Sequence, residues 1–258
     1  MDRITGPTGT TVSYDRYGGG PPLVLVHGSF SDHLTNWQEV KPLLQERFTV
    51  YALARRGRGE TSPTRGHSVD DEAADVVAVL ETVEQPAFLL GHSYGAVCAL
   101  GAAAQDPSGV RKLVLYEHPG PTVITPRLLT ALEELAQRRD WDTLVETFMR
   151  DALQVPPAEV KAIKATPFWQ LWTADAEASL NDLRALSRHR FDAARYRSLT
   201  RPVQLLIGTE SPRALYFTDA LAASLPNARV TELEGQAHEG MTTAPEQFVE
   251  AISRFLLE

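Results

Sequence analysis

The amino-acid sequence predicts an α/β fold in which a mostly parallel sheet is flanked by helices. Short apolar runs typical of buried strands alternate with segments of helical periodicity, and this pattern indicates strand–helix–strand units. The alternation stops near residue 122, gives way to helical patterns until about residue 199, and then resumes. With 258 residues, the chain is long enough for one large domain with a well-buried core.

The strands expected before the interruption are short and are bounded by turn-forming residues. The first ends at a run of three glycines and two prolines, residues 18–22, which predicts a turn. The predicted strands cover residues 10–17, 23–26, 48–53, 87–90 and 110–116. The predicted helices cover residues 35–46, 68–84 and 96–104. The second helix is the clearest, because its apolar residues recur at helical spacing.

Residues 122–199 carry many large apolar side chains but no convincing strand, and prolines such as Pro156 and Pro167 divide the segment into several helices. After it, we expect strands over 203–208 and 229–233 and helices over 214–225 and 244–257. The chain is therefore predicted to fold as a core of residues 1–121 and 200–258 with a helical insertion between them.

Composition and charge narrow the class of function. The net charge of −8 argues against nucleic acid or an anionic membrane surface as the main partner. The single cysteine, Cys98, allows no internal disulfide and is expected to be a buried, inert thiol. No apolar run approaches the roughly 18 residues of a membrane span, and no secretory signal follows Met1. We expect a cytoplasmic protein with a small-molecule partner, and the sequence does not predict its oligomeric state.

The most informative residues form the pentapeptide Gly91-His92-Ser93-Tyr94-Gly95, which follows an apolar run of strand type and precedes a helix-like run of small residues. A strand, a tight Gly-x-Ser-x-Gly turn and a helix form a nucleophile elbow, in which the serine hydroxyl is exposed at the end of a sheet. Glycines are required because the strand and helix backbones nearly touch there. The helix N-terminus also favours negative charge. The motif predicts Ser93 as a nucleophile.

The order of the elements resembles the α/β-hydrolase fold, and the resemblance covers essentially the whole chain. It rests on four features in the family's order: His27-Gly28 after a strand, the Arg/Gly loop at 55–59, the Gly-x-Ser-x-Gly turn and a late His238. The resemblance implies that residues 122–199 form a helical cap inserted after the sixth strand. Ala54 stands where relatives often have aspartate, and this difference touches no predicted catalytic residue.

The resemblance also assigns the catalytic base. A serine hydroxyl needs a base to take its proton, and a histidine oriented by a carboxylate can do so. In this fold the chain order is serine, acid, histidine. Two histidines lie beyond residue 118, and His189 sits in an arginine-rich stretch that is typical of a solvated helix face. His238, in a glycine-flanked loop after the last strand, occupies the family's position for the base.

Two glutamates compete for the role of the acid. The family usually places the acid in the loop after the strand that follows the cap, and Glu210 occupies that place. Glutamate can orient a histidine as aspartate does, with a longer reach. The alternative is Glu117, at the end of the strand that precedes the cap, because some relatives carry the acid there. The sequence favours Glu210.

The resemblance places the oxyanion hole at two backbone amides. One belongs to Tyr94, the residue after the nucleophile, and the other to Ser29, with Phe30 next in line. The longer glycine run of lipases is absent at this place, so lipase behaviour is not expected.

Aromatic side chains are expected to contribute to the substrate pocket. Trp169 and Trp172 are spaced three apart, on one face of a predicted helix, and Phe30 follows the oxyanion residue. The alternative is that these side chains only pack the cap onto the core, since large apolar residues mostly pack. The set favours an apolar acyl group, an aromatic ester or a lactone over a highly charged substrate.

The sequence therefore predicts a cofactor-free serine hydrolase, a carboxylesterase or lactonase, that acts on a small, largely apolar ester or lactone through an acyl-enzyme on Ser93. No His-Glu-x-x-His or Cys-x-x-Cys motif occurs, so no metal site is expected. An acyltransferase, a perhydrolase or haloperoxidase, or a lyase could use the same residues. A non-catalytic small-ligand receptor is the alternative outside enzymes.

Overall fold

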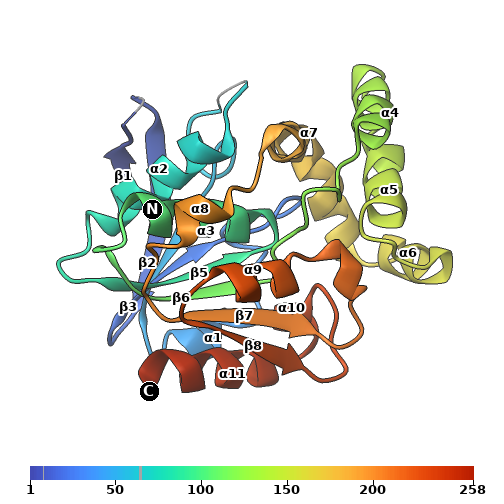
Figure 1. Ribbon diagram of the computed structural model, residues 1–258. Helices are drawn as coiled ribbons and strands as arrows, with labels where there is room; N and C mark the ends of the chain where they lie inside the picture. Colours follow the sequence, from blue (N-terminus) through green and yellow to red (C-terminus); the bar gives the residue numbers. More distant parts are fainter. Residues whose placement is uncertain (8, 64–65) are drawn as a thin grey trace.

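The computed structural model describes residues 1–7, 9–63 and 66–258, and the strands among them form one sheet in the order β1-β2-β4-β3-β5-β6-β7-β8 (Figure 1). The strands are β1 (Asp2–Thr5), β2 (Thr11–Gly18), β3 (Pro22–Val26), β4 (Thr49–Ala54), β5 (Ala87–His92), β6 (Val110–Tyr116), β7 (Val203–Gly208) and β8 (Ala228–Leu233). Strand β2 is antiparallel to both of its neighbours, and all other pairs are parallel. The predicted fold class is confirmed.

The sequence analysis missed β1. This strand is only four residues long and mostly exposed, so it carries no apolar pattern that distinguishes it from a loop. It pairs with β2 from Asp2 opposite Tyr14 to Thr5 opposite Thr11. The other predicted strands match the observed ones to within a few residues.

Helices of the core cover both faces of the sheet. They are α1 (Lys41–Leu44), α2 (Val69–Leu80), α3 (Tyr94–Gln105), α9 (Thr218–Ser224), α10 (Gly240–Thr243) and α11 (Pro245–Leu257). The helix expected over 35–46 is reduced to α1, because the Asp32 side chain accepts hydrogen bonds from the amides of Leu34 and Thr35 and holds a turn there. No helix within the described ranges is both long and apolar enough to cross a membrane.

Alternate residues of the central strands pack on opposite sides of the sheet. In β3, Val24 and Val26 join the apolar cluster that includes α2 and α3, whereas Leu23 and Leu25 join the cluster that includes α1 and α11. All four side chains are fully buried. This period of two explains why the strand reads as a continuous apolar run, since a parallel strand with helices on both faces buries both of its sides.

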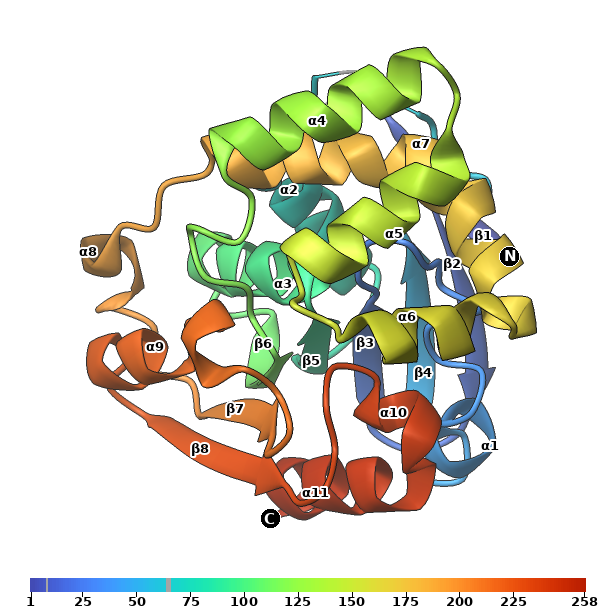
Figure 2. The same cartoon turned by 90° about the vertical axis from the view of Figure 1, so that its right-hand side faces the viewer.

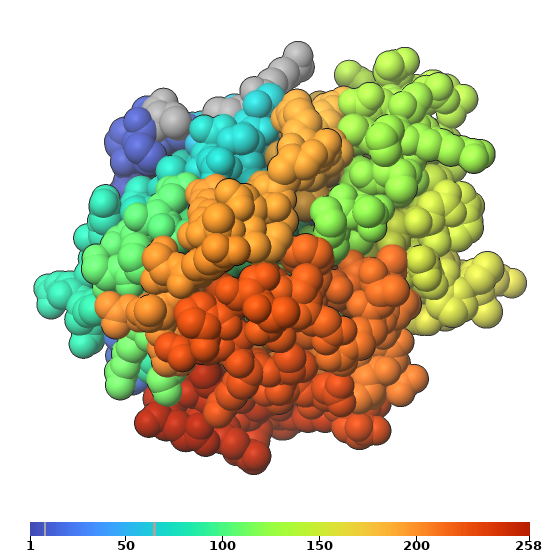
Figure 3. All heavy atoms as spheres, in the orientation of Figure 1, coloured from blue at the N-terminus to red at the C-terminus, as the bar shows by residue number. Residues whose placement is uncertain are grey.

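The residues between β6 and β7 form the helices of the predicted cap. These are α4 (Pro126–Gln137), α5 (Trp141–Asp151), α6 (Pro157–Lys164), α7 (Pro167–Arg188) and α8 (Ala193–Tyr196). In Figures 1 and 2, α4, α5 and α6 lie on the side toward which the parallel strands point. Figure 3 shows them as a lobe in green and yellow at one side of the molecule. The carboxyl ends of the strands, where ligands bind in such sheets, thus lie under the cap.

The packing of the elbow generates a test of the fold. A Cβ added to Gly95 would lie 2.2 Å from the backbone oxygen of Val26 and 2.4 Å from that of His27, and backbone cannot move aside cheaply. We expect Gly95→Ala to lower the free energy of unfolding by about 1–3 kcal/mol or more, and the thermal midpoint by several degrees. The measurement is a circular-dichroism melt. Gly19→Ala, where a Cβ has no neighbour within 4 Å, is the control and should melt as the unsubstituted protein does.

Candidate active site

Ser93 stands at the turn between β5 and α3 with a strained backbone. Its φ is 54° and its ψ is −125°, a backbone conformation that residues other than glycine rarely adopt. The turn is closed by close contact, because a Cβ on Gly91 would lie 2.4 Å from the Gly95 oxygen. The Ser93 amide donates to the Tyr116 carbonyl at 2.9 Å, and the side chain is partly exposed. The local geometry has the features expected of a nucleophile elbow.

His238 pairs with Glu117 and not with Glu210. Its Nδ1 lies 2.6 Å from Oε2 of Glu117, and the Glu117 carboxylate is completely buried. Glu210 is exposed, and within residues 1–7, 9–63 and 66–258 its carboxylate receives a single 3.5 Å contact, from the Thr209 hydroxyl. The expectation that Glu210 is the partner of the histidine is therefore corrected by the geometry, which places the alternative residue there. The reason is direction: Glu117 turns inward at the end of β6, whereas Glu210 turns to solvent after β7.

Glu117 is held by the strand beside it. The amide of Gly208 donates to Oε1 at 2.9 Å, and the hydroxyl of Ser211 donates to the same oxygen. Burial alone would raise the pKa of Glu117, but the hydrogen bonds from His238, Ser211 and Gly208 lower it overall. Glu117 itself has a φ of 50°. A strained residue whose carboxylate is ionised, buried and fully hydrogen-bonded is suited to orient a base.

Tyr216 is a contact of the histidine that the sequence analysis missed. Its ring stacks on that of His238, with centroids 5.5 Å apart and an angle of 19° between planes. Its hydroxyl lies 3.1 Å from His238 Nδ1. Burial, followed by the charge of Glu117, raises the pKa of Tyr216, so it stays a neutral phenol. Nothing in the sequence distinguishes this tyrosine from an ordinary core aromatic, because only the folded chain brings it to the histidine.

The pKa of His238 is set by opposing effects. Burial lowers it, but the hydrogen bond and the charge of Glu117 raise it above the ordinary histidine value overall. With Nδ1 directed at Glu117, Nε2 is the nitrogen left for a substrate or a serine. Among the described residues no hydrogen bond joins Ser93 to His238, and such bonds are often long in structures without substrate.

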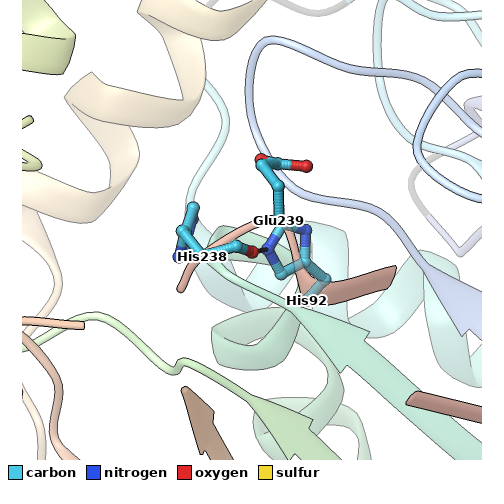
Figure 4. A group of neighbouring side chains, drawn as sticks. All are labelled: His92, His238 and Glu239. Atoms are coloured by element: carbon cyan, nitrogen blue, oxygen red, sulfur yellow. Dashed lines mark hydrogen bonds between the residues drawn. The ribbon is translucent and has the colours of Figure 1, made fainter. Parts of the chain in front are cut away.

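His92, the residue before the serine, fastens the loop that carries His238. Its Nε2 lies 3.0 Å from the His238 carbonyl oxygen, the contact dashed in Figure 4, and its Nδ1 lies 3.1 Å from Oδ1 of Asn36. The rings of His92 and His238 are 4.7 Å apart. Burial lowers the pKa of His92 well below its ordinary value, so the ring stays neutral. The residue before Ser93 thus helps to fix the position of the loop that carries His238.

In the part of the chain that the structure describes, two groups of side chains have the composition of a metal site, but each includes side chains already engaged in protein contacts. In the first, His92, His238 and Glu239 offer atoms within 4.8 Å of one another, yet both nitrogens of His92 are engaged as described above. Figure 4 shows the His238 ring and the Glu239 carboxyl leaving the loop in different directions. Burial raises the pKa of Glu239 to about 7, which weakens it as a ligand.

The second group, His67, Glu72 and Asp182, already surrounds a cation. The guanidinium of Arg55 donates to Glu72 at 2.9 Å and to Asp182 at 2.8 Å. A metal ion there would have to displace a buried arginine. The engaged nitrogens of His92 in the first group and the buried Arg55 in the second therefore argue against metal ligation at either place.

The loop of residues 28–30, which we call the oxyanion loop, lies against the nucleophile. A Cβ added to Gly28 would lie 3.2 Å from the Cβ of Ser93. The amide of Phe30 is occupied, since it donates to the hydroxyl of Ser179 at 2.5 Å. Among the described residues, the amides of Ser29 and Tyr94 donate no hydrogen bond within the protein. Both amides predicted for the oxyanion hole are thus without a protein acceptor among the described residues, and their role stays a prediction.

The aromatic residues predicted for the pocket lie in different surroundings. Phe30 is buried between core and cap, with its ring 4.5 Å from that of Phe148 on α5. The Trp169 indole donates to Asp142 at 2.6 Å, and its ring lies 6.4 Å from that of Trp172. Trp169 thus has contacts that fit packing within the cap, whereas Phe30 lies in the loop beside Ser93.

Comparison with known proteins adds a family and several relatives. A sequence model described as the alpha/beta hydrolase family matches residues 23–251. The chain is 28% identical over 266 residues to a 2-(acetamidomethylene)succinate hydrolase of Mesorhizobium japonicum, covering 95% of this chain and 91% of that protein. It is 42% identical over 110 residues to an N-formylmaleamate deformylase of Pseudomonas putida, a match that covers 41% of each protein.

A solved structure is similar over nearly its whole length. It is an alpha/beta hydrolase from Sphaerobacter thermophilus, with a TM-score of 0.86 and 30% sequence identity. The match covers 98% of this chain and 99% of that one.

The pairing of His238 with Glu117 is testable without a substrate. Because the charge and hydrogen bond of Glu117 raise the pKa of His238, Glu117→Gln should lower that pKa below its value in the unsubstituted protein. Glu210→Gln is the matched control and should leave it unchanged. The measurement is an NMR titration of the His238 ring. A pKa that falls in the Glu210 variant and stays in the Glu117 variant would reverse the assignment.

Proposed function

The chain belongs to the alpha/beta hydrolase family, and we propose that it is a serine hydrolase that cleaves a carboxylic ester or lactone of a small, largely apolar molecule. Ser93 is the proposed nucleophile, His238 the base and Glu117 the acid. The observation that carries the proposal is the 2.6 Å contact between His238 Nδ1 and the buried carboxylate of Glu117. The loop of His238 lies next to Ser93, whose backbone is strained.

The proposed reaction uses the histidine twice. His238 Nε2 takes the proton of the Ser93 hydroxyl as the serine oxygen attacks the acyl carbon, and the carbonyl oxygen becomes negative. The amides of Ser29 and Tyr94 stabilise that charge, helped by the N-terminus of α3. The acyl–oxygen bond then breaks, and His238 returns the proton to the leaving alcohol oxygen. Water attacks the acyl-enzyme with His238 again as base, which releases the acid and restores Ser93.

Glu117 stays ionised throughout this cycle. The lowered pKa of its buried carboxyl keeps it charged at neutral pH, so it stabilises the imidazolium that forms at each proton transfer. Tyr216, stacked on the histidine, limits the rotation of the ring. The expected pH dependence follows: kcat/KM rises with pH through the pKa of His238, because only the neutral ring accepts the serine proton.

The charges around the site favour a neutral acyl group. The arginines near the oxyanion loop, Arg55 and Arg58, are buried and are paired with carboxylates, including that of Asp182. A paired guanidinium has little capacity left to bind a substrate carboxylate. This supports an uncharged ester or lactone over a dicarboxylic acid derivative.

A second candidate is hydrolysis of a small N-acyl amide. The observation in its favour is that the relatives described above are named as a hydrolase of an acetamido compound and as a deformylase. The same residues would serve, with His238 protonating the leaving nitrogen instead of an oxygen. A panel of short p-nitrophenyl esters, lactones and N-formyl or N-acetyl amides, compared by kcat/KM, distinguishes the two candidates.

Mutation of the proposed triad tests the role of each residue. Ser93→Ala should lower kcat for a p-nitrophenyl ester by about 10⁴–10⁶-fold, and Glu117→Gln by roughly 10²–10⁴-fold. Glu210→Gln should leave kcat unchanged, since that carboxylate faces solvent. A fluorophosphonate probe should add one adduct to the unsubstituted protein by intact mass and none to the Ser93 variant. A folded protein that neither reacts with the probe nor turns over any panel member contradicts the proposed function.

A further inference from the structure

We propose that the cap holds the oxyanion loop in place, through Ser179 and Asp182 of α7, so that these two are positioning residues for the oxyanion hole. The inference rests on the proposed function, because it assigns part of the same site. It goes beyond that function in giving the cap a task in stabilising the transition state, separate from any contact with substrate.

Two hydrogen bonds join the oxyanion loop directly to α7. The hydroxyl of Ser29 donates to Oδ2 of Asp182 at 2.9 Å, and the amide of Phe30 donates to the Ser179 hydroxyl at 2.5 Å. The partners are about 150 residues apart in the chain, with separations of 153 and 149. Consecutive residues of the loop are thus fixed to side chains three residues, or about one turn, apart on one helix.

Ser179 and Asp182, the residues of α7 that make these contacts, are themselves held by buried arginines. Arg58 donates to both oxygens of Asp182, at 3.0 and 2.8 Å, and to the Ser179 hydroxyl at 2.8 Å. The Arg55 guanidinium donates to Asp182 at 2.8 Å. The side chain of Asp182 has no exposed surface, and those of the two arginines are 1–2% exposed. Charge-assisted bonds in such a site have a fixed geometry, and removing one partner would leave a buried charge uncompensated.

Arg55 carries the same network to the other side of the site. It donates to the carbonyl oxygens of His27 and Gly28, both at 2.8 Å, and its guanidinium lies 4.7 Å from the centre of the Tyr94 ring. One arginine therefore contacts both Gly28, which precedes Ser29, and Tyr94. Ser29 and Tyr94 carry the two amides proposed for the oxyanion hole.

The backbone of the loop needs such support. Phe30 has a φ of 57°, a strained conformation for a non-glycine residue that persists only when its surroundings enforce it. The bond to Ser179 and the packing on Phe148 are the contacts that enforce it here. With the Phe30 amide bound to Ser179, the Ser29 amide is the donor that remains for an oxyanion. Ser179 thus determines which amide of the loop is available.

Loss of this support should affect the transition state more than the bound substrate. The negative charge on the oxygen develops only as the serine attacks. If the loop has moved, its amide stabilises that charge less well in the transition state, whereas binding of the neutral substrate is unaffected. The histidine and its acid are held by other residues, Tyr216 and Ser211 among them. A fall in kcat with an unchanged KM and an unchanged pKa of His238 is therefore the signature of the proposed role.

The test compares three variants of the full chain. Ser179→Ala removes the acceptor of the Phe30 amide, and Ser29→Ala removes the bond to Asp182 while keeping the Ser29 amide. The control is Arg184→Gln on the same helix, whose side chain contacts half-exposed Glu133 and Asn181 among the described residues. For each, amide exchange at Phe30 is measured by NMR, with kcat and KM for a p-nitrophenyl ester and the pKa of His238.

We expect Ser179→Ala to speed exchange at Phe30 and to lower kcat about 10–100-fold, with KM and the pKa of His238 unchanged. Ser29→Ala should lower kcat in the same way by a smaller factor, and it decides the question if Ser179→Ala does not fold. The control should match the unsubstituted protein. Unchanged exchange, unchanged kcat or a change in KM alone overturns the inference.

The inference and the proposed function can fail separately. If the unsubstituted protein does not react with a fluorophosphonate, the proposed function fails, and exchange at Phe30 still decides whether α7 holds the loop. If the protein reacts and Ser179→Ala behaves as the control does, the function stands and the inference fails.

Discussion

The arrangement of the site depends on one buried carboxylate, that of Asp182. It accepts hydrogen bonds from Arg55, Arg58 and Ser29, which come from two loops of the core, while it belongs to a helix of the cap. Burial alone would raise the pKa of Asp182, but the two arginines lower it well below its usual range, so it is ionised. Such a cluster adds little net stability, because desolvation offsets most of the attraction. Its main effect is on geometry, because each charged side chain has its charge compensated in only one position, and the two loops are held accordingly.

Much of this architecture follows from local sequence patterns. The strand, the tight turn and the helix around Ser93 are consecutive, so their geometry could be read from neighbouring residues. His238 is predicted as the base from the resemblance to the family, which places that histidine in a loop after the last strand. The choice between Glu117 and Glu210 could not be made in this way, because both end a strand of the same sheet and only the direction of the side chain separates them. That direction comes from the hydrogen bonds of Gly208 and Ser211, more than 90 residues from Glu117.

The contacts of Tyr216 and Ser179 show a second limit of sequence reasoning. Both act through residues far away in the chain, and neither carries a motif. The backbone conformation gives a partial signal. Ser93, Glu117 and Phe30 have positive φ values, between 50° and 57°, and strain of this kind is retained only where packing enforces it. The two other non-glycine residues with positive φ in the described ranges, Arg139 and Gln154, follow helices α4 and α5 of the cap.

The position of Glu117 also bears on how such proteins diversify. The chain enters the cap a few residues after Glu117, with α4 beginning at Pro126, and returns through β7. Gly208, at the end of β7, and Ser211, just beyond it, donate hydrogen bonds to the same carboxylate. Both junctions of the insertion are therefore tied to one point, and a cap of another length could be spliced in without moving the acid. The oxyanion loop has no such independence, since its anchors lie within α7. A cap from another protein would leave the proposed triad in place, but it would have to supply its own counterpart of Asp182 to hold the oxyanion loop.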